Sequence, residues 1–318
     1  MAQQEPVLAH RRVWVAGHRG MVGSALMRAL APEGADLLAV GHDELDLRRQ
    51  SDTEAWMHRN RPELIFIAAA KVGGILANDR YPAQYIYDNL QIQLNIVEAA
   101  RQIGVAKVML LGSSCIYPRL APQPISEDSL LTGPLEETNQ WYAIAKIAGL
   151  KMVEAYRAQY GFSGISLMPT NLYGPGDNFD LNSSHVLPAL IRKFHEAKLA
   201  GAPAVSIWGS GTPRREFLHV DDLAEAAVLL METYDRPEIV NVGTGTDVTI
   251  RELAEMIAKI TGFQGELAFD ATKPDGTPRK LLDVSRAKAA GWSAKISLEQ
   301  GIQSTYQWYL DSQGRRRD

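Results

Sequence analysis

Short apolar runs alternate with longer helix-like stretches through the first 174 residues. The strand-like runs are 11–17, 36–40, 63–70, 107–114 and 164–174, and the helix-like stretches are 21–31, 51–60, 82–103 and 138–160. Strands that alternate with helices are typical of parallel βαβ units. Strands that are apolar along their whole length are typical of a sheet covered on both faces. We therefore predict an α/β fold built on a doubly wound parallel sheet.

This alternation loses its regularity after residue 174. A loop rich in Gly, Pro, Asn and Asp covers 174–184, and the pieces that follow are shorter. A chain of 318 residues is also long for a single hydrophobic core. We therefore predict a main domain at 11–174 and a smaller C-terminal α/β lobe mainly at 175–318. Some segments of that second range are expected to return to the main domain.

Composition excludes several classes of function. The net charge of −4 provides no basic field for nucleic acid or an anionic membrane, and no apolar run approaches the roughly 20 residues that span a bilayer. A single cysteine excludes an intrachain disulfide and a multi-thiolate metal site, so we expect no metal. We expect a cytoplasmic protein with a frayed start of about ten residues.

The segment AGHRGMVG at 16–23 places three glycines at intervals of three, directly after a predicted strand and before a predicted helix. Gly17 permits a tight bend, Gly20 allows backbone to approach a pyrophosphate, and Gly23 allows close helix–strand packing. The spacing alone is a weak signal, but its strand–turn–helix context strengthens it. The sequence thus predicts a Rossmann dinucleotide site formed by Gly17, His18, Arg19, Gly20, Met21, Val22 and Gly23.

The end of the second predicted strand gives a mixed signal for the choice of nicotinamide cofactor. An acidic residue there favours a free ribose 2′-hydroxyl, and a basic residue favours a 2′-phosphate. The chain reads Val40-Gly41-His42-Asp43 at this point. Because Arg19 lies inside the glycine turn and can face a 2′-phosphate, we expect NADP(H).

Tyr142 and Lys146 lie four residues apart in a predicted helix and so share a face. Such a tyrosine can donate a proton to a carbonyl oxygen while a hydride attacks the carbon. A lysine ammonium one turn away is expected to lower the phenol pKa. Ser113, at the end of a neighbouring strand, can complete an oxyanion-binding pair. Alone the pair is common on helix surfaces; with the glycine turn it indicates carbonyl reduction.

Cys115 is the only cysteine and lies in GSSCIYP at 112–118. A lone cysteine is more often a small buried residue than a reactive one. This one follows the fourth predicted strand, at the sheet edge where open α/β folds bind ligands.

Seven segments together resemble the extended short-chain dehydrogenase/reductases that act on nucleotide sugars, and within them the GDP-L-fucose synthases. The segments are AGHRGMVGSA (16–25), AAAKVGGI (68–75), LGSSCIYP (111–118), YAIAKIAG (142–149), MPTNLYGP (168–175), WGSGTPRREFLHVDD (208–222) and KPDGTPRKLLDV (273–284). The similarity extends from about residue 11 to about residue 310.

This resemblance implies that GDP-4-keto-6-deoxy-D-mannose is epimerised at C3 and C5 and that NADPH then reduces the C4 ketone. It implies a homodimer formed through the helices at 82–103 and 138–160. Tyr142 corresponds to the proton donor to the ketone, Lys146 to its partner and Ser113 to the hydroxyl beside the ketone. Cys115 corresponds to the base of epimerisation and His185 to the acid.

The resemblance also assigns further binding residues. Outside the glycine turn, the positions expected to line the cofactor are Leu111, Gly112, Ser113, Ser114, Lys146, Pro169, Thr170, Asn171, Leu172 and His185. The positions expected to bind the substrate are Lys193, Trp208, Arg215 and Asp275. One departure is His42, where some members carry an arginine near the 2′-phosphate, so discrimination against NADH is expected to be weaker.

Two alternatives remain at this stage. A related nucleotide-sugar epimerase or dehydratase would retain its NAD(P) and turn over without added NADPH; dehydratases usually place Thr and an acidic residue where this chain has Ser113 to Cys115. A non-catalytic dinucleotide sensor on the same fold would be expected to lack Tyr142 and Lys146, which are present.

Overall fold

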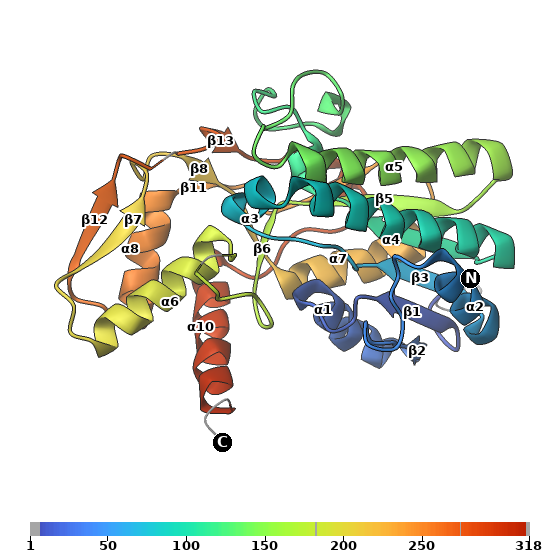
Figure 1. Cartoon of the computed structure of the whole chain (residues 1–318), viewed down its shortest axis with the longest axis horizontal. Helices are drawn as coiled ribbons and strands as arrows, with labels where there is room; N and C mark the ends of the chain where they lie inside the picture. Colours follow the sequence, from blue (N-terminus) through green and yellow to red (C-terminus); the bar gives the residue numbers. More distant parts are fainter. Residues whose placement is uncertain (1–6, 182, 274, 316–318) are drawn as a thin grey trace.

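The computed structural model describes residues 7–181, 183–273 and 275–315. Its centre is a six-stranded, wholly parallel sheet in the order β10-β5-β4-β3-β1-β2 (Figure 1). The strands are β1 (Arg12–Ala16), β2 (Asp36–Leu38), β3 (Leu64–Ile67), β4 (Lys107–Leu111), β5 (Gly164–Pro169) and β10 (Val240–Val242). The predicted doubly wound α/β fold is confirmed.

Helices cover both faces of this sheet (Figure 1). On one face α1 (Met21–Leu30) packs against α7 (Val220–Thr233), and their apolar side chains join those of β1, β3 and β5 in one core. On the other face lie α2 (Gln50–Asn60), α4 (Pro82–Ile103) and α5 (Gln140–Tyr160), and α4 packs along α5. Both faces of the central strands are therefore buried, which explains their uninterrupted apolar sequences.

A second body lies beyond the carboxyl ends of these strands. Its core is built mainly from α6 (Val186–Leu199), α8 (Ile250–Thr261) and the strand pair β7 (Ala204–Trp208) and β12 (Glu266–Asp270), with α10 (Leu298–Arg315). Two small sheets connect it to the main body. They are formed by β6 (Asn171–Tyr173) with β9 (Phe217–His219), and by β8 (Arg214–Arg215) with β11 (Val248–Thr249) and β13 (Arg279–Lys280). The short helices are α3 (Ile75–Arg80) and α9 (Ser285–Ala289).

The expected fraying of about ten N-terminal residues is wrong in part. Residues 1–6 lie outside the described residues, but Leu8 is fully buried in the core beside α1. The amide of His10 donates to the carbonyl oxygen of Gly34 at 2.9 Å. An apolar anchor and a backbone hydrogen bond therefore hold this segment against the sheet. In the described parts of the chain, no helix is both long enough and apolar enough to cross a membrane.

Helix α4 buries polar residues and exposes apolar ones. Asp88, Asn89 and Gln93 lie in the interior, whereas Leu94 is 37% exposed. The Asn89 amide group explains part of this, because it donates to the carbonyl oxygens of Lys71 and Tyr85 at 3.0 and 2.7 Å. The apolar residue Leu94 of α4 therefore faces outward.

Candidate active site

The glycine turn connects β1 to α1. In the sheet β1 lies between β2 and β3, so the strands that follow it in sequence lie on opposite sides of it, and the strand order reverses at this point. Gly17 has a φ of +87°, and a Cβ added there would lie 2.7 Å from the backbone of Ala69, which follows β3. A Cβ on Gly23 would lie 2.0 Å from the carbonyl oxygen of Gly17. Glycine at these two positions is therefore what closes the turn against its neighbours.

The turn fits an anionic dinucleotide. Gly20 is exposed at the N-cap of α1, and an added Cβ would meet only the Gly17 oxygen, at 3.5 Å. Among the described residues no side chain caps this helix, and Nδ1 of His18 is buried without a hydrogen-bond partner. Free amide groups and the positive end of the helix dipole attract a pyrophosphate at such a position. The predicted segment Gly17–Gly23 thus has the required geometry.

Arg19 forms an ion pair with Asp43, 24 residues further along the chain. Its Nη1 lies 2.8 Å from Oδ1 of Asp43, and both side chains are mostly exposed. A Cβ on Gly41 would lie 2.6 Å from the same nitrogen, so glycine leaves room for the guanidinium. A backbone hydrogen bond and the charge of Arg19 lower the pKa of Asp43. An ionised carboxylate and a guanidinium therefore share the region after β2 that binds the 2′ position of a ribose.

Tyr142, Lys146 and Ser113 lie at the junction of α5 and β4. Ser113 caps the turn after β4, where its Oγ accepts a hydrogen bond from the amide of Cys115 at 3.2 Å. Lys146 is buried, and its Nζ donates to the carbonyl oxygen of Leu111 at 2.8 Å. The same nitrogen lies 5.8 Å from the centre of the Tyr142 ring. The structure thus brings the three predicted residues together.

The pKa of Tyr142 moves in the direction opposite to the expectation from the sequence. Burial raises it most, nearby Cys115 raises it further, and a hydrogen bond with Ser113 opposes part of the rise. Burial also lowers the pKa of Lys146 to about 8. The expected lowering of the phenol pKa by Lys146 is therefore wrong, because desolvation of the phenolate dominates the shift. A raised pKa keeps the phenol protonated at neutral pH, as a proton donor requires.

Cys115 is a partly exposed thiol with two nitrogen donors beside it. Nζ of Lys280 lies 3.4 Å and Nδ2 of Asn139 lies 3.6 Å from its sulfur. A small cavity of about 40 Å³ adjoins the thiol and is lined also by Glu136 and Arg279. Reactive cysteines occur in partly exposed, polar surroundings of this kind. The bland interpretation of a buried, inert cysteine does not fit these surroundings.

His185 forms the N-cap of α6 and keeps contact with solvent. The surrounding protein lowers its pKa by desolvation, and the charge of Lys280 lowers it further. Lys280 therefore acts on both Cys115, which it contacts, and His185, whose charge it disfavours. Cys115 and His185, the predicted base and acid, are thus both influenced by Lys280, although 70 residues separate them in the sequence.

The other predicted cofactor-lining positions follow the ends of β4 and β5. The amide of Gly112 donates to Leu167 at 2.8 Å, which keeps 111–114 beside β5. Thr170 and Asn171 both direct their side chains to the carbonyl oxygen of Glu216, at 3.3 and 2.8 Å. These bonds fix the path of 169–172 from β5 into β6. Both segments lie at the carboxyl edge of the sheet, on the side of the glycine turn.

The four predicted substrate residues form two contacting pairs, Lys193 with Trp208 and Arg215 with Asp275. Nζ of Lys193 lies 5.6 Å from the centre of the Trp208 ring, which is 49% exposed. Asp275 accepts hydrogen bonds from the amide and hydroxyl of Ser210 at 2.7 and 2.8 Å. Nη2 of Arg215 lies 3.4 Å from the carbonyl oxygen of Asp275. Two cations and an exposed aromatic ring suit a nucleoside diphosphate.

Sequence reasoning missed Lys280 and Asn139. Both lie in or near segments that carried the resemblance, but nothing in their spacing connects them to Cys115. Lys280 is 165 residues away from the thiol and reaches it only because β13 pairs with β8. The sole available signal was the repeated pair of basic residues, Arg214-Arg215 and Arg279-Lys280.

Comparison with known proteins shows the family of this chain. The sequence profile of the NAD dependent epimerase/dehydratase family matches residues 13–243. Among solved structures, a GDP-6-OMe-4-keto-L-xylo-heptose reductase from C. jejuni is similar with a TM-score of 0.92 at 35% identity, covering 96% of this chain and 99% of that one. A GDP-L-fucose synthetase from Naegleria fowleri, solved with NADP bound, is similar with a TM-score of 0.90 at 27% identity, covering 99% of each chain.

Curated relatives match over nearly the whole length. A probable GDP-L-fucose synthase 1 of Oryza sativa subsp. japonica is 58% identical over 303 residues, 95% of this chain and 92% of that protein. The GDP-L-fucose synthase of Escherichia coli strain K12 is 54% identical over 320 residues, 98% of this chain and 100% of that protein. By this similarity and by its fold, the chain belongs to the GDP-L-fucose synthases, within the NAD dependent epimerase/dehydratase family.

Proposed function

We propose that this protein converts GDP-4-keto-6-deoxy-D-mannose to GDP-L-fucose, by epimerising C3 and C5 and reducing the C4 ketone with NADPH. The observation that carries the proposal is that groups suited to ketone reduction and a group suited to epimerisation lie together at the turn after β4. Ser113 and Tyr142 offer hydroxyl groups for a ketone, and Cys115 offers a thiol beside Lys280. Membership in the family supports the same reaction.

Reduction needs a proton donor at the ketone oxygen. A nicotinamide, when bound, supplies the hydride. Tyr142, kept protonated by burial, gives its proton to the C4 oxygen, and the hydroxyl of Ser113 orients that oxygen. Lys146 is held by the carbonyl oxygen of Leu111, so its ammonium stays within reach of the phenol ring and of a cofactor ribose. After the transfer its positive charge stabilises the phenolate that remains.

Epimerisation needs a base and an acid on opposite faces of the sugar. C3 and C5 flank the ketone, so loss of a proton from either gives an enolate. Cys115, in contact with Nζ of Lys280, takes the proton. His185 delivers a proton to the other face. Tyr142 and Ser113 stabilise the enolate oxygen.

Two ligand assignments complete the proposal. Arg215 and Lys193 pair with the diphosphate of a GDP-sugar, Trp208 contacts its base or sugar, and Asp275 holds the loop around them. NADP(H) is the proposed cofactor, and Arg19 would hold its 2′-phosphate. The ion pair of Arg19 with Asp43 is mostly exposed, so separating it costs little.

A homodimer through α4 and α5 is supported by what these helices expose. They lie side by side on one face of the molecule (Figure 1). Leu94 on α4, and Trp141 and Ile144 on α5, are each 37 to 40% exposed. Adjacent exposed apolar residues of this kind mark association surfaces. We propose further that the main body binds the dinucleotide, that the smaller body binds the sugar nucleotide, and that the enzyme works in the cytoplasm.

Incubation with GDP-4-keto-6-deoxy-D-mannose and NADPH tests the proposal. We expect one NADPH consumed for each GDP-L-fucose formed. Turnover without added NADPH would favour a retained-cofactor epimerase or dehydratase and overturn the proposal, as would the absence of product. In D₂O without NADPH, deuterium should enter C3 and C5. Cys115→Ser should lose most of that exchange and still reduce a substrate that is already epimerised, whereas intact exchange would remove Cys115 as the base.

A further inference from the structure

The small sheet β11-β8-β13 has two faces with different contacts. Each of its strands has two residues, and β8 pairs with β13 in the register Arg214 with Arg279 and Arg215 with Lys280. Successive side chains of a strand point to opposite faces. Arg215 and Lys280 therefore share the face that meets Asp275 and the Cys115 sulfur. Arg214 and Arg279 share the other face.

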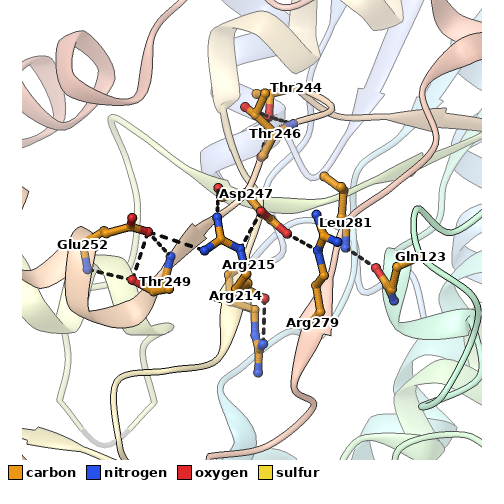
Figure 2. A network of polar contacts seen from close by, with 10 residues as sticks. All are labelled: Gln123, Arg214, Arg215, Thr244, Thr246, Asp247, Thr249, Glu252, Arg279 and Leu281. Atoms are coloured by element: carbon orange, nitrogen blue, oxygen red, sulfur yellow. Dashed lines mark hydrogen bonds and ion pairs between the residues drawn. The ribbon is translucent and has the colours of Figure 1, made fainter.

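Asp247 joins the two arginines on that other face. Its Oδ1 accepts from Nε of Arg214 at 2.8 Å, and its Oδ2 accepts from Nε of Arg279 at 2.5 Å (Figure 2). Its backbone oxygen accepts from Nη2 of Arg214 at 2.9 Å. The carboxylate is only 5% exposed, although both arginines reach solvent. One buried anion, directly before β11, thus connects all three strands.

The backbone ladder between β8 and β13 is short, because each strand has only two residues. At its ends, Arg214 N donates to Pro278 O at 2.8 Å and Glu216 N donates to Lys280 O at 3.3 Å. Two charge-assisted hydrogen bonds to one carboxylate are individually stronger than such neutral bonds. The bridge through Asp247 therefore reinforces the ladder that positions Lys280 relative to β8.

We propose that Asp247 is a positioning residue, whose bridge between Arg214 and Arg279 fixes β13 on β8 and thereby holds Lys280 against the Cys115 thiol. An effect on epimerisation rests on the proposed function, whereas the positioning of Lys280 by the Asp247 bridge does not. Asp247 has no contact with the thiol and acts only through the strand. Adjacent anchors survive its loss. Leu281 N donates to Gln123 Oε1 at 2.9 Å (Figure 2), and Leu282 N donates to Glu216 Oε2 at 3.0 Å.

The single cysteine makes a direct test possible. Alkylation by iodoacetamide at neutral pH reports the reactivity of Cys115 alone, without substrate or cofactor. Asp247→Asn keeps the shape and removes the charge of the bridge. We expect alkylation about fivefold slower, the order of effect of one ammonium at short range near a protein surface. Lys280→Gln should slow it to the same extent, and Asp247→Asn should add nothing further in the Lys280→Gln background.

Glu252→Gln is the matched control. Glu252 pairs with the same Arg214, at 3.8 Å, but does not reach β13 (Figure 2). Glutamine preserves its capping bond to Thr249, so alkylation should stay within about twofold of wild type. Asp247→Glu, which retains the charge, should recover part of the rate and serves as the test if the asparagine variant does not fold. A wild-type rate in the asparagine variant, or a further slowing in the Lys280→Gln background, would overturn the proposal.

Because this assay needs neither GDP-sugar nor NADPH, its result is independent of the proposed reaction. If that reaction is also correct, Asp247→Asn should lower the deuterium exchange at C3 and C5 by a factor similar to that for alkylation. Its affinity for NADPH should be unchanged, because the bridge lies outside the glycine turn.

Discussion

Alanine substitution at two glycines of the same turn should have different effects: at Gly23 it should lower stability, and at Gly20 it should weaken dinucleotide binding. At Gly23 an added Cβ would lie 2.0 Å from the oxygen and 2.6 Å from the carbon of Gly17, and 2.7 Å from Cα of His18. All three are backbone atoms, so no side chain can move aside. At Gly20 the added Cβ would meet only the Gly17 oxygen, at 3.5 Å, and the backbone there has an ordinary extended conformation.

The magnitudes follow from these contacts. Gly23→Ala must move α1 away from the turn by about an ångström, at a cost near the upper end of the roughly 1–3 kcal/mol typical of overpacking. That cost corresponds to a loss of roughly 5 °C or more in Tm. Gly20→Ala replaces an N-cap glycine by a poorer cap and should cost about 1 kcal/mol or less. Its methyl group would occupy the space that a pyrophosphate needs, which should weaken dinucleotide binding at least about tenfold.

Differential scanning fluorimetry without ligand measures the first effect, and calorimetric titration with NADPH measures the second. We expect Gly23→Ala to show a large loss of Tm, and Gly20→Ala to show a near-normal Tm with a greatly raised Kd. If Gly20→Ala lowered the Tm as much as Gly23→Ala, the fold itself would require glycine at position 20, and the prediction would be wrong. If Gly20→Ala bound NADPH like wild type, the turn would not be the pyrophosphate site.

Three further outcomes are expected. Tyr142→Phe should abolish NADPH oxidation, because its protonated phenol supplies the proton to the ketone; stopped-flow absorbance checks this, and retained oxidation would assign the proton to another group. Lys107 is buried with its pKa lowered to about 8, first by desolvation. Since an unfolded lysine titrates near 10.4, the unfolded state binds more protons between these values, and stability rises with pH through about 8 to 10. Lys107→Met should flatten that rise in urea unfolding curves, and an unchanged slope would contradict the titration. Leu94→Glu should halve the mass seen by light scattering at micromolar concentration, and an intact dimer would place the interface elsewhere.

The sequence was sufficient for elements that carry their own pattern. Helix α4 was expected at 82–103 and spans Pro82–Ile103, because Pro82 begins its first turn and Gly104 ends it in the left-handed region. The parallel sheet could be predicted because its strands are buried on both faces, so apolar residues run along them without alternating with polar ones. Strand ends were less well predicted: β3 was expected over 63–70 and ends at Ile67. Apolar residues continue past the last ladder bond, into the segment that packs on Gly17.

Elements of two residues could not be predicted. β8, β11 and β13 are too short for any period to be visible, and their pairing joins residues 33 to 65 positions apart. Lys280 reaches Cys115 only through this pairing, so its role was invisible from spacing. The direction of the Tyr142 pKa was also missed, since four-residue spacing reveals proximity to Lys146 but not the burial of the phenol.

Differences in burial and in neighbouring charge distinguish the two reactive groups of the site, Tyr142 and Cys115. Tyr142, on α5, lies where desolvation raises its pKa and keeps it an acid, whereas Cys115 is partly exposed in the turn after β4, beside an ammonium. Each of the two groups thus has its own lysine: Lys146 is buried on a backbone carbonyl near the phenol, and Lys280 is carried by a strand from the other body. A change that moves the smaller body should therefore affect the thiol before the phenol. Proton exchange at C3 and C5 would then be more sensitive than ketone reduction to substitutions around β13.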